Sequence, residues 1–209
     1  MQPRLDMYKA APGAYRAMAA LEAYVRDSSH LEPPLLELVR LRASQINGCA
    51  FCIDMHTKDA RAARETEQRL YCLDAWREAP FYTDRERAAL AWTEAITRIG
   101  EGHAPDDVFA EARQQFTDEE LSNLTIAIVA INGWNRLAIG FRAVAGEYQP
   151  RAARAQQEKL AGAARAANMS PATGQAGHGH SQISQKLLPH ELSDFQPLPT
   201  PSRITPCHP

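Results

Sequence analysis

The amino-acid sequence predicts an all-α fold. Alanine is abundant and β-branched residues are sparse, a composition that favours helix over sheet. Apolar residues recur at helical spacing along residues 12–146, and helix start and stop signals separate these stretches. With 209 residues, 44% of them hydrophobic, the chain is long enough for one domain with an ordinary packed core.

The first third of the chain predicts three successive helices. One covers residues near 15–25, and the next begins at Pro33-Pro34, where the missing N–H groups cost nothing in a first turn. The dipeptide Asn47-Gly48 is a stop signal that should end this second helix. A third helix is then expected to start at about residue 49 and to run through residue 64.

Two capping boxes mark the starts of later helices. Thr83 with Glu86 precedes a helix that Gly100 should end. A second box at Thr117 precedes a long apolar helix that runs from residue 121 towards 144. A helix that is apolar on most sides must be buried, so this one is expected at the centre of the domain or in a subunit interface.

The composition changes after Pro150, and we therefore divide the chain into a helical domain over residues 1–150 and an appendage over residues 151–209. Residues 151–167 are rich in alanine and could form a helix. Residues 168–209 are rich in Pro, Gly, Ser and Gln. They hold too few apolar residues to offset the entropy of ordering, so a disordered C-terminal tail is predicted.

The charge and the longest apolar run bear on partners and compartment. The net charge is only −2, which gives no reason to expect nucleic acid or an anionic membrane as the main partner. The N-terminus lacks the apolar run of a signal peptide, and residues 124–131 are too few to span a bilayer. We expect a cytoplasmic protein, in which a close cysteine pair is more often redox-active or metal-binding than structural.

The most informative motif is the spacing of Cys49, Cys52 and His56. On a continuous helix these positions would fall within about 60° of one another around the axis, so two thiols and an imidazole would share one face. A helix that starts here would also bring free N–H groups and the positive end of its dipole to the thiols, and both stabilise a thiolate. His56 would then be close enough to accept the thiol proton, directly or through water.

Glu37 is the candidate partner of this imidazole. It lies in an otherwise apolar stretch of the preceding helix, where an unpaired carboxylate is costly. A carboxylate that orients His56 would complete an arrangement of a nucleophile, a general base and a group that positions the base.

Other interpretations fit the same residues. The two cysteines could be small buried core residues, or they could bind zinc together with His56 and a fourth ligand. His56 could be a core histidine whose hydrogen bonds are satisfied, and Glu37 could simply pair with Arg40 or Arg42 on its own helix. A redox sensor that cycles the disulfide without useful turnover is a further alternative.

The motif resembles that of a known family. Glu37, followed twelve residues later by Cys-x-x-Cys and then by x-x-x-His, is similar to the AhpD-like alkylhydroperoxidases of the carboxymuconolactone decarboxylase superfamily. The amino-acid sequence from residue 41 to 60 is similar to that of many members, and residues 127–136 resemble the last core helix of the family. The resemblance covers roughly residues 5–148.

The resemblance implies an AhpD-like all-α domain that reduces hydroperoxides through a thiol cycle. Cys52 would attack the peroxide, Cys49 would resolve the sulfenic acid to a disulfide, and His56 with Glu37 would form the proton relay. The expected partners are a hydroperoxide substrate, a thiol or dithiol reductant protein and further copies of the chain, as a trimer or hexamer. We expect no cofactor and no metal. The chain departs from the best-studied members at Phe51, where they place a histidine.

Overall fold

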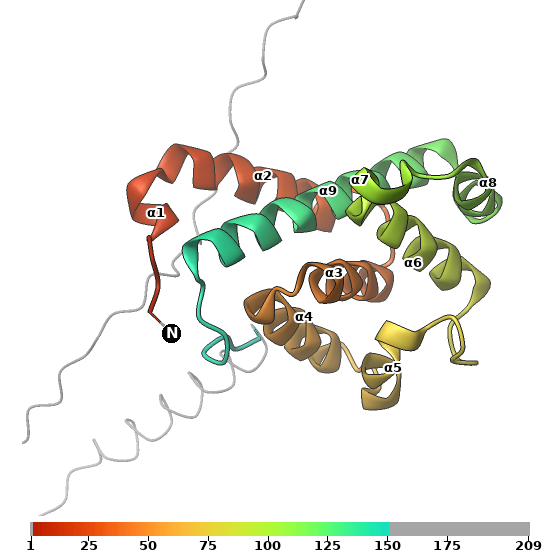
Figure 1. Cartoon of the computed structure of the whole chain (residues 1–209), viewed down its shortest axis with the longest axis horizontal. Coiled ribbons are helices and arrows are strands. Elements are labelled where there is room, and N and C mark those ends of the chain that lie inside the picture. Colours follow the sequence, from red (N-terminus) through yellow and green to blue (C-terminus); the bar gives the residue numbers. More distant parts are fainter. Residues whose placement is uncertain (1, 151–209) are drawn as a thin grey trace, which may run out of the picture. The chain divides into compact units, whose positions relative to one another are not determined.

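The computed structural model describes residues 2–150, and within this range every regular element is a helix. The prediction of an all-α fold is therefore confirmed (Figure 1). In chain order the elements are α1 (Met7–Ala10), α2 (Pro12–Ser28), α3 (Pro33–Asn47), α4 (Ala50–Ala62), α5 (Glu67–Tyr71), the short 3-10 helix η1 (Leu73–Ala75), α6 (Asp84–Thr97), α7 (Ile99–Gly102), α8 (Asp106–Gln115) and α9 (Asp118–Phe141).

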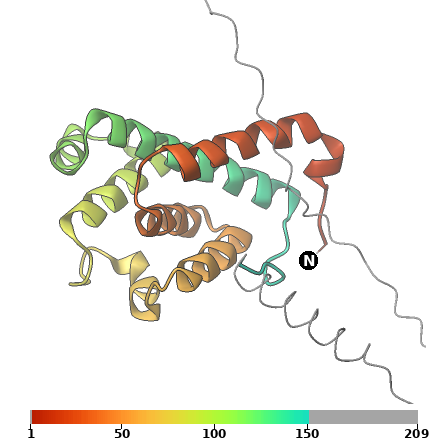
Figure 2. The same ribbon diagram turned by 180° about the vertical axis from the view of Figure 1, so that it is seen from behind.

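Helix α3 is the central element. It packs against α4, α6 and α9, and both views show it surrounded by them (Figures 1 and 2). Its apolar residues Leu38, Val39 and Leu41 are fully buried. Burying each such side chain contributes about 1.5–3 kcal/mol, so α3 is firmly held. The polar side chains that α3 carries are consequently fixed in position.

The turn between α3 and α4 sets the position of the cysteine motif. Gly48 ends α3 in the left-handed conformation, with φ of 68°, as the stop signal predicted. Cys49 follows as the N-cap of α4, in an extended conformation with φ of −84° and ψ of 93°. The helix therefore starts at Ala50, one residue later than expected. The prediction that Cys49, Cys52 and His56 share a continuous helical face is wrong for Cys49, because its backbone is not helical.

The capping boxes at Thr83 and Thr117 are both present, and they start α6 and α9 as predicted. The predicted end of α6 at Gly100 is wrong. The helix ends at Thr97, and Gly100 lies inside the short helix α7. Glycine stops a helix by adopting positive φ, but the residue that does so here is His103, with φ of 54°, and it ends α7.

Helix α9 runs alongside α2, as both views show, and also packs on α3, α4 and α6 (Figures 1 and 2). It reaches the length and mean hydropathy of a membrane span, with 39% of its most apolar window buried. Contacts with these neighbouring helices account for much of its apolar composition. The predicted burial is only partial, because Ile126, Val129 and Ile139 are exposed.

The last described segment, residues 142–150, is tied to α4 by hydrogen bonds. Lys58 donates to the carbonyls of Gly146 and Tyr148 at 3.3 and 3.0 Å, and the Gly146 amide donates to Asp54 at 3.0 Å. We call this segment the strap. The helix predicted over 151–167 and the disordered tail predicted over 168–209 lie outside the described residues.

Candidate active site

The two motif cysteines are in contact and buried. Their Sγ atoms are 2.8 Å apart and not covalently bonded, and each residue is 1% exposed. Together with Ala43 of α3 and Ile131 of α9 they form a small apolar cluster, against which Phe51 and Trp134 pack. Phe51, which stands where the best-studied relatives place a histidine, therefore covers the thiols and brings no titratable group to them.

The surroundings of the two thiols are different. A hydrogen bond from the Cys52 thiol, with contributions from the backbone amide of Cys52, the Asn135 side chain and the backbone amide of Phe51, outweighs burial and lowers the pKa of Cys49 to about 7. The same sulfur contact, together with burial, raises the pKa of Cys52. The pair therefore loses one proton near neutral pH, and the resulting charge is stabilised at the N-terminus of α4.

Asn135 of α9 anchors the cysteine pair to the core. It is fully buried, donates from Nδ2 to the Ser44 hydroxyl at 3.1 Å and accepts from Nδ2 of Asn47 at 2.9 Å. Its side chain lowers the pKa of both cysteines. Asn135 therefore combines buried hydrogen bonding with a position beside the two thiols.

His56 and Glu37 form the second half of the site. His56 Nδ1 lies 2.9 Å from Glu37 Oε2, and the histidine is buried. The other carboxylate oxygen of Glu37 accepts from Arg40 at 2.7 Å, and Arg40 in turn bonds Glu22 of α2 at 2.5 Å. Burial alone would raise the pKa of Glu37, but the hydrogen bond and charge of His56 and the charge of Arg40 outweigh it and lower this pKa.

Both partners considered for Glu37, an arginine on its own helix and His56, are present in the structure. The carboxylate pairs with Arg40 on its own helix and with His56 on the next helix at once, so the two readings are not exclusive. Arg42 instead faces Asp74 and Glu94. Cys52 and His56 are four residues apart within α4, which places their side chains on the same face, one turn from each other.

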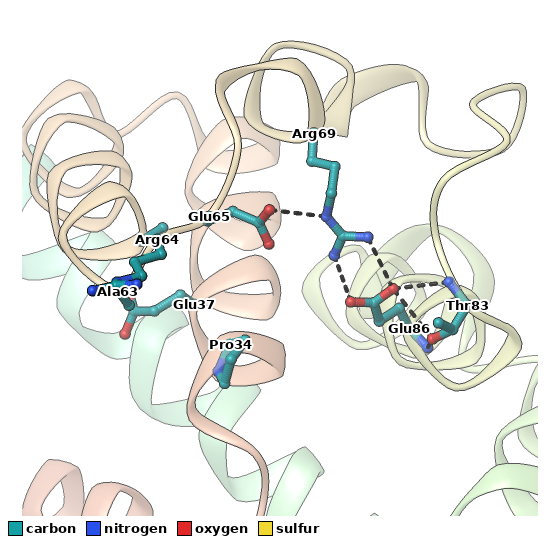
Figure 3. Close-up of a pocket in the computed structure, with 9 residues that line it drawn as sticks. Pro34, Glu37, Ala63, Arg64, Glu65, Arg69, Thr83 and Glu86 are labelled. Carbon is teal, nitrogen blue, oxygen red and sulfur yellow. Dashed lines mark hydrogen bonds and ion pairs between the residues drawn. The ribbon is translucent and has the colours of Figure 1, made fainter.

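A cavity of about 330 Å³ opens beside Glu37 (Figure 3). On one side lie Pro34, Ala63 and Arg64, and on the other Arg69 lies between Glu65 and Glu86. The cysteines are not among its lining residues. The cavity therefore reaches the carboxylate end of the Glu37–His56 pair.

One further carboxyl group approaches this pair. Within residues 2–150, Glu37, His56 and Asp59 form a group in which each side chain has one atom that could ligate a metal within 4.8 Å of those of the other two. Neither cysteine belongs to this group. Arg40 bonds Glu37, and the Tyr148 hydroxyl bonds Asp59, so these oxygens already have partners. We assign no metal to this group.

Asp59 and Tyr148 were missed by sequence reasoning. The signal for Asp59 was its position three residues after His56, which puts the two on one helix face. The remaining cysteine of the described range, Cys72, is partly buried against a separate apolar cluster that includes Leu73 and Trp76.

Replacing Asn135 with alanine tests its effect on the thiols. We expect the pKa of the more acidic thiol to rise above about 7, because an amide that stabilises the charged form is lost. The measurement is the rate of iodoacetamide alkylation against pH. Ser122→Ala on the exposed start of α9 is the control, and an unchanged profile for Asn135→Ala would contradict the assignment.

Comparison with known proteins places this site in a family. The model of the carboxymuconolactone decarboxylase family matches residues 12–95, which include Glu37, both motif cysteines and His56. YdfG of Bacillus subtilis, an uncharacterised protein, is 45% identical over 139 residues, which are 66% of this chain and 94% of YdfG.

Solved structures agree. A protein of unknown function from Agrobacterium tumefaciens, provisionally named as the antioxidant defence protein AhpD, is 49% identical with a TM-score of 0.68, over 70% of this chain and 100% of that one. An uncharacterised peroxidase-related protein from Silicibacter is 21% identical with a TM-score of 0.57, over 63% and 70% of the two chains, and shows a similar fold. The family resemblance is confirmed: this chain belongs to the carboxymuconolactone decarboxylase family and has an AhpD-like fold.

Proposed function

We propose that this protein is a thiol-dependent peroxidase that reduces hydroperoxides with the Cys49–Cys52 pair. The observation that carries the proposal is the 2.8 Å contact between the two thiols at the N-terminus of α4, since the hydrogen bond with Cys52, aided by backbone amides, lowers the pKa of Cys49 to about 7. A pair that ionises at neutral pH, with the second thiol already in contact, suits both attack on a peroxide and closure to a disulfide.

The proposed cycle starts when the thiol pair passes one proton to His56. The charge first resides on Cys49, the more acidic thiol, and transfer of the remaining proton from Cys52 to Cys49 across the 2.8 Å sulfur contact then moves the charge to Cys52. The Cys52 thiolate attacks the outer peroxide oxygen, the O–O bond breaks, and the alkoxide takes the proton from His56 to leave as an alcohol. The Cys49 thiol then condenses with the Cys52 sulfenic acid, which forms the disulfide and releases water.

Glu37 has an electrostatic role in this cycle. It orients the imidazole through Nδ1 and balances the positive charge that His56 gains, while Arg40 keeps the carboxylate ionised. Cys52 is the proposed attacking sulfur because it is the one that has His56 on the next turn of its helix. Because both thiols are buried in a cluster against which Phe51 and Trp134 pack, a substrate can reach them only if side chains around this cluster move.

The proposal includes partners. A thiol or dithiol reductant protein would return the disulfide to the dithiol form, and a reducing cytoplasm would maintain it. The exposed Ile126, Val129 and Ile139 of α9 support assembly into a homo-oligomer, a trimer or a hexamer. Light scattering during size-exclusion chromatography measures this state directly.

The test is consumption of cumene hydroperoxide by the metal-stripped protein with dithiothreitol supplied. We expect turnover, and we expect one equivalent of peroxide without reductant to remove two of the four thiols. If the thiols of the protein as purified are unreactive until zinc is removed, and the metal-stripped protein shows no turnover, the metal-binding alternative replaces the peroxidase. Loss of two thiols without turnover would favour a redox sensor.

Sulfenic acid trapping identifies the attacking sulfur. In Cys49→Ser the sulfenic acid on Cys52 cannot be resolved, so dimedone should label Cys52 after peroxide treatment. Labelling of Cys49 in Cys52→Ser, with none in Cys49→Ser, would reverse the order of the two sulfurs.

A further inference from the structure

Asp59 connects the strap to the Glu37–His56 pair. The Tyr148 hydroxyl donates to both carboxylate oxygens of Asp59, at 2.8 and 2.9 Å. Asp59 lies three residues after His56 on α4, and its carboxyl is within 4.8 Å of ligand-type atoms of both Glu37 and His56. A residue near the end of the described chain thereby fixes a carboxyl group beside the proposed proton relay.

The two carboxyl groups of this cluster are pushed in opposite directions. Burial raises the pKa of Asp59, and the charge of Glu37 adds to this, against the Tyr148 hydrogen bond and the charges of His56 and Arg40. The pKa of Glu37 is lowered. When like charges are this close, one group ionises first, and here it is Glu37.

We propose that Asp59 is a positioning residue for the His56–Glu37 pair, held in place by Tyr148, and that its ionisation favours the protonated form of His56. The inference deepens the proposed function, since it concerns the same proton relay. The charged and titratable groups that face Asp59 within residues 2–150 are Glu37 and Arg40 from α3, His56 from α4 and Tyr148 from the strap.

The consequence concerns the thiols. A negative charge on Asp59 stabilises the imidazolium, and the imidazolium holds the proton that the thiol pair has lost. Ionised Asp59 should therefore lower the pH at which the thiol pair forms a thiolate, a transition set by the Cys49 pKa of about 7.

The experiment measures iodoacetamide alkylation against pH in the full chain with Cys72 and Cys207 replaced by serine, so that only the motif pair reacts. In Asp59→Asn, we expect the midpoint of the alkylation profile to move to higher pH, so that alkylation at pH values below the midpoint falls about threefold or more. In Tyr148→Phe, the midpoint should move in the same direction by a smaller amount, because Asp59 loses the hydrogen bond that holds its carboxylate in place and favours its ionised form.

Asp54→Asn is the matched control. Asp54 also holds the strap, through the Gly146 amide and Lys58, but it is not part of the cluster with His56. We expect its alkylation profile to match that of the parent. If the strap acted only by holding α4 in place, the profile of Asp54→Asn would shift as well.

Superimposable profiles for the parent, Asp59→Asn and Tyr148→Phe would overturn the inference. If Asp59→Asn does not fold, Tyr148→Phe alone decides. Because alkylation requires no peroxide, its outcome is independent of turnover. An alkylation profile that depends on Asp59 in a protein without peroxidase activity would leave this inference standing while the proposed function fails.

Discussion

Replacing Cys52 with serine is expected to reduce hydroperoxide turnover at least about a thousandfold. The hydroxyl of serine remains protonated at neutral pH and is not oxidised by peroxide, so both the nucleophile and the disulfide are lost. The measurement is the initial rate of cumene hydroperoxide consumption with dithiothreitol, over a range of peroxide concentrations.

Cys72→Ser is the control for this variant. Cys72 is partly buried in a different cluster from the motif pair, so its replacement should leave the rate within about twofold. If Cys52→Ser retained the wild-type rate, Cys52 would not carry the reaction.

The second large effect is expected from Glu94→Ala. Glu94 is buried and accepts hydrogen bonds from Trp76 at 2.9 Å, from Arg42 at 2.8 Å and from Arg77 at 2.5 Å. Its removal leaves the buried guanidinium of Arg42 with Asp74 as its one remaining acidic partner. Breaking a buried ion pair in this way costs about 3–5 kcal/mol. Urea unfolding at fixed protein concentration, followed by circular dichroism, measures the change.

Glu111→Ala, on the exposed face of α8, is the control and should change stability by less than about 0.5 kcal/mol. The hydrogen bonds to Glu94 outweigh burial and lower its pKa below 4.5. The stability that Glu94 contributes is therefore complete above that value and is lost as the pH falls through the lowered pKa. Equal unfolding midpoints for Glu94→Ala and Glu111→Ala would contradict this account of the α3–α6 contact.

Local signals in the sequence predicted a large part of the fold and of the candidate site. The stop at Gly48 and the boxes at Thr83 and Thr117 are short-range patterns, and each starts or ends a helix as expected. Glu37 was recognised because a carboxylate in an apolar stretch needs a partner, and His56 on the next helix is that partner.

The remaining features depend on information that local patterns do not carry. The helical face assigned to Cys49 failed because α4 begins one residue later, and one residue at a helix start separates a cap from a helical position. Asn135 and Tyr148 reach the site from far along the chain. Their contacts with Ser44 and Asp59 span 91 and 89 residues, so they follow from tertiary packing.

The measurement that tests the central claim most directly is peptide mapping by mass spectrometry after one equivalent of hydroperoxide, with free thiols blocked before digestion. Our account predicts an intramolecular disulfide between Cys49 and Cys52, with Cys72 and Cys207 still alkylated. Peroxide-treated protein with Cys49 and Cys52 both alkylated, or with an oxidised Cys72 in their place, would contradict it.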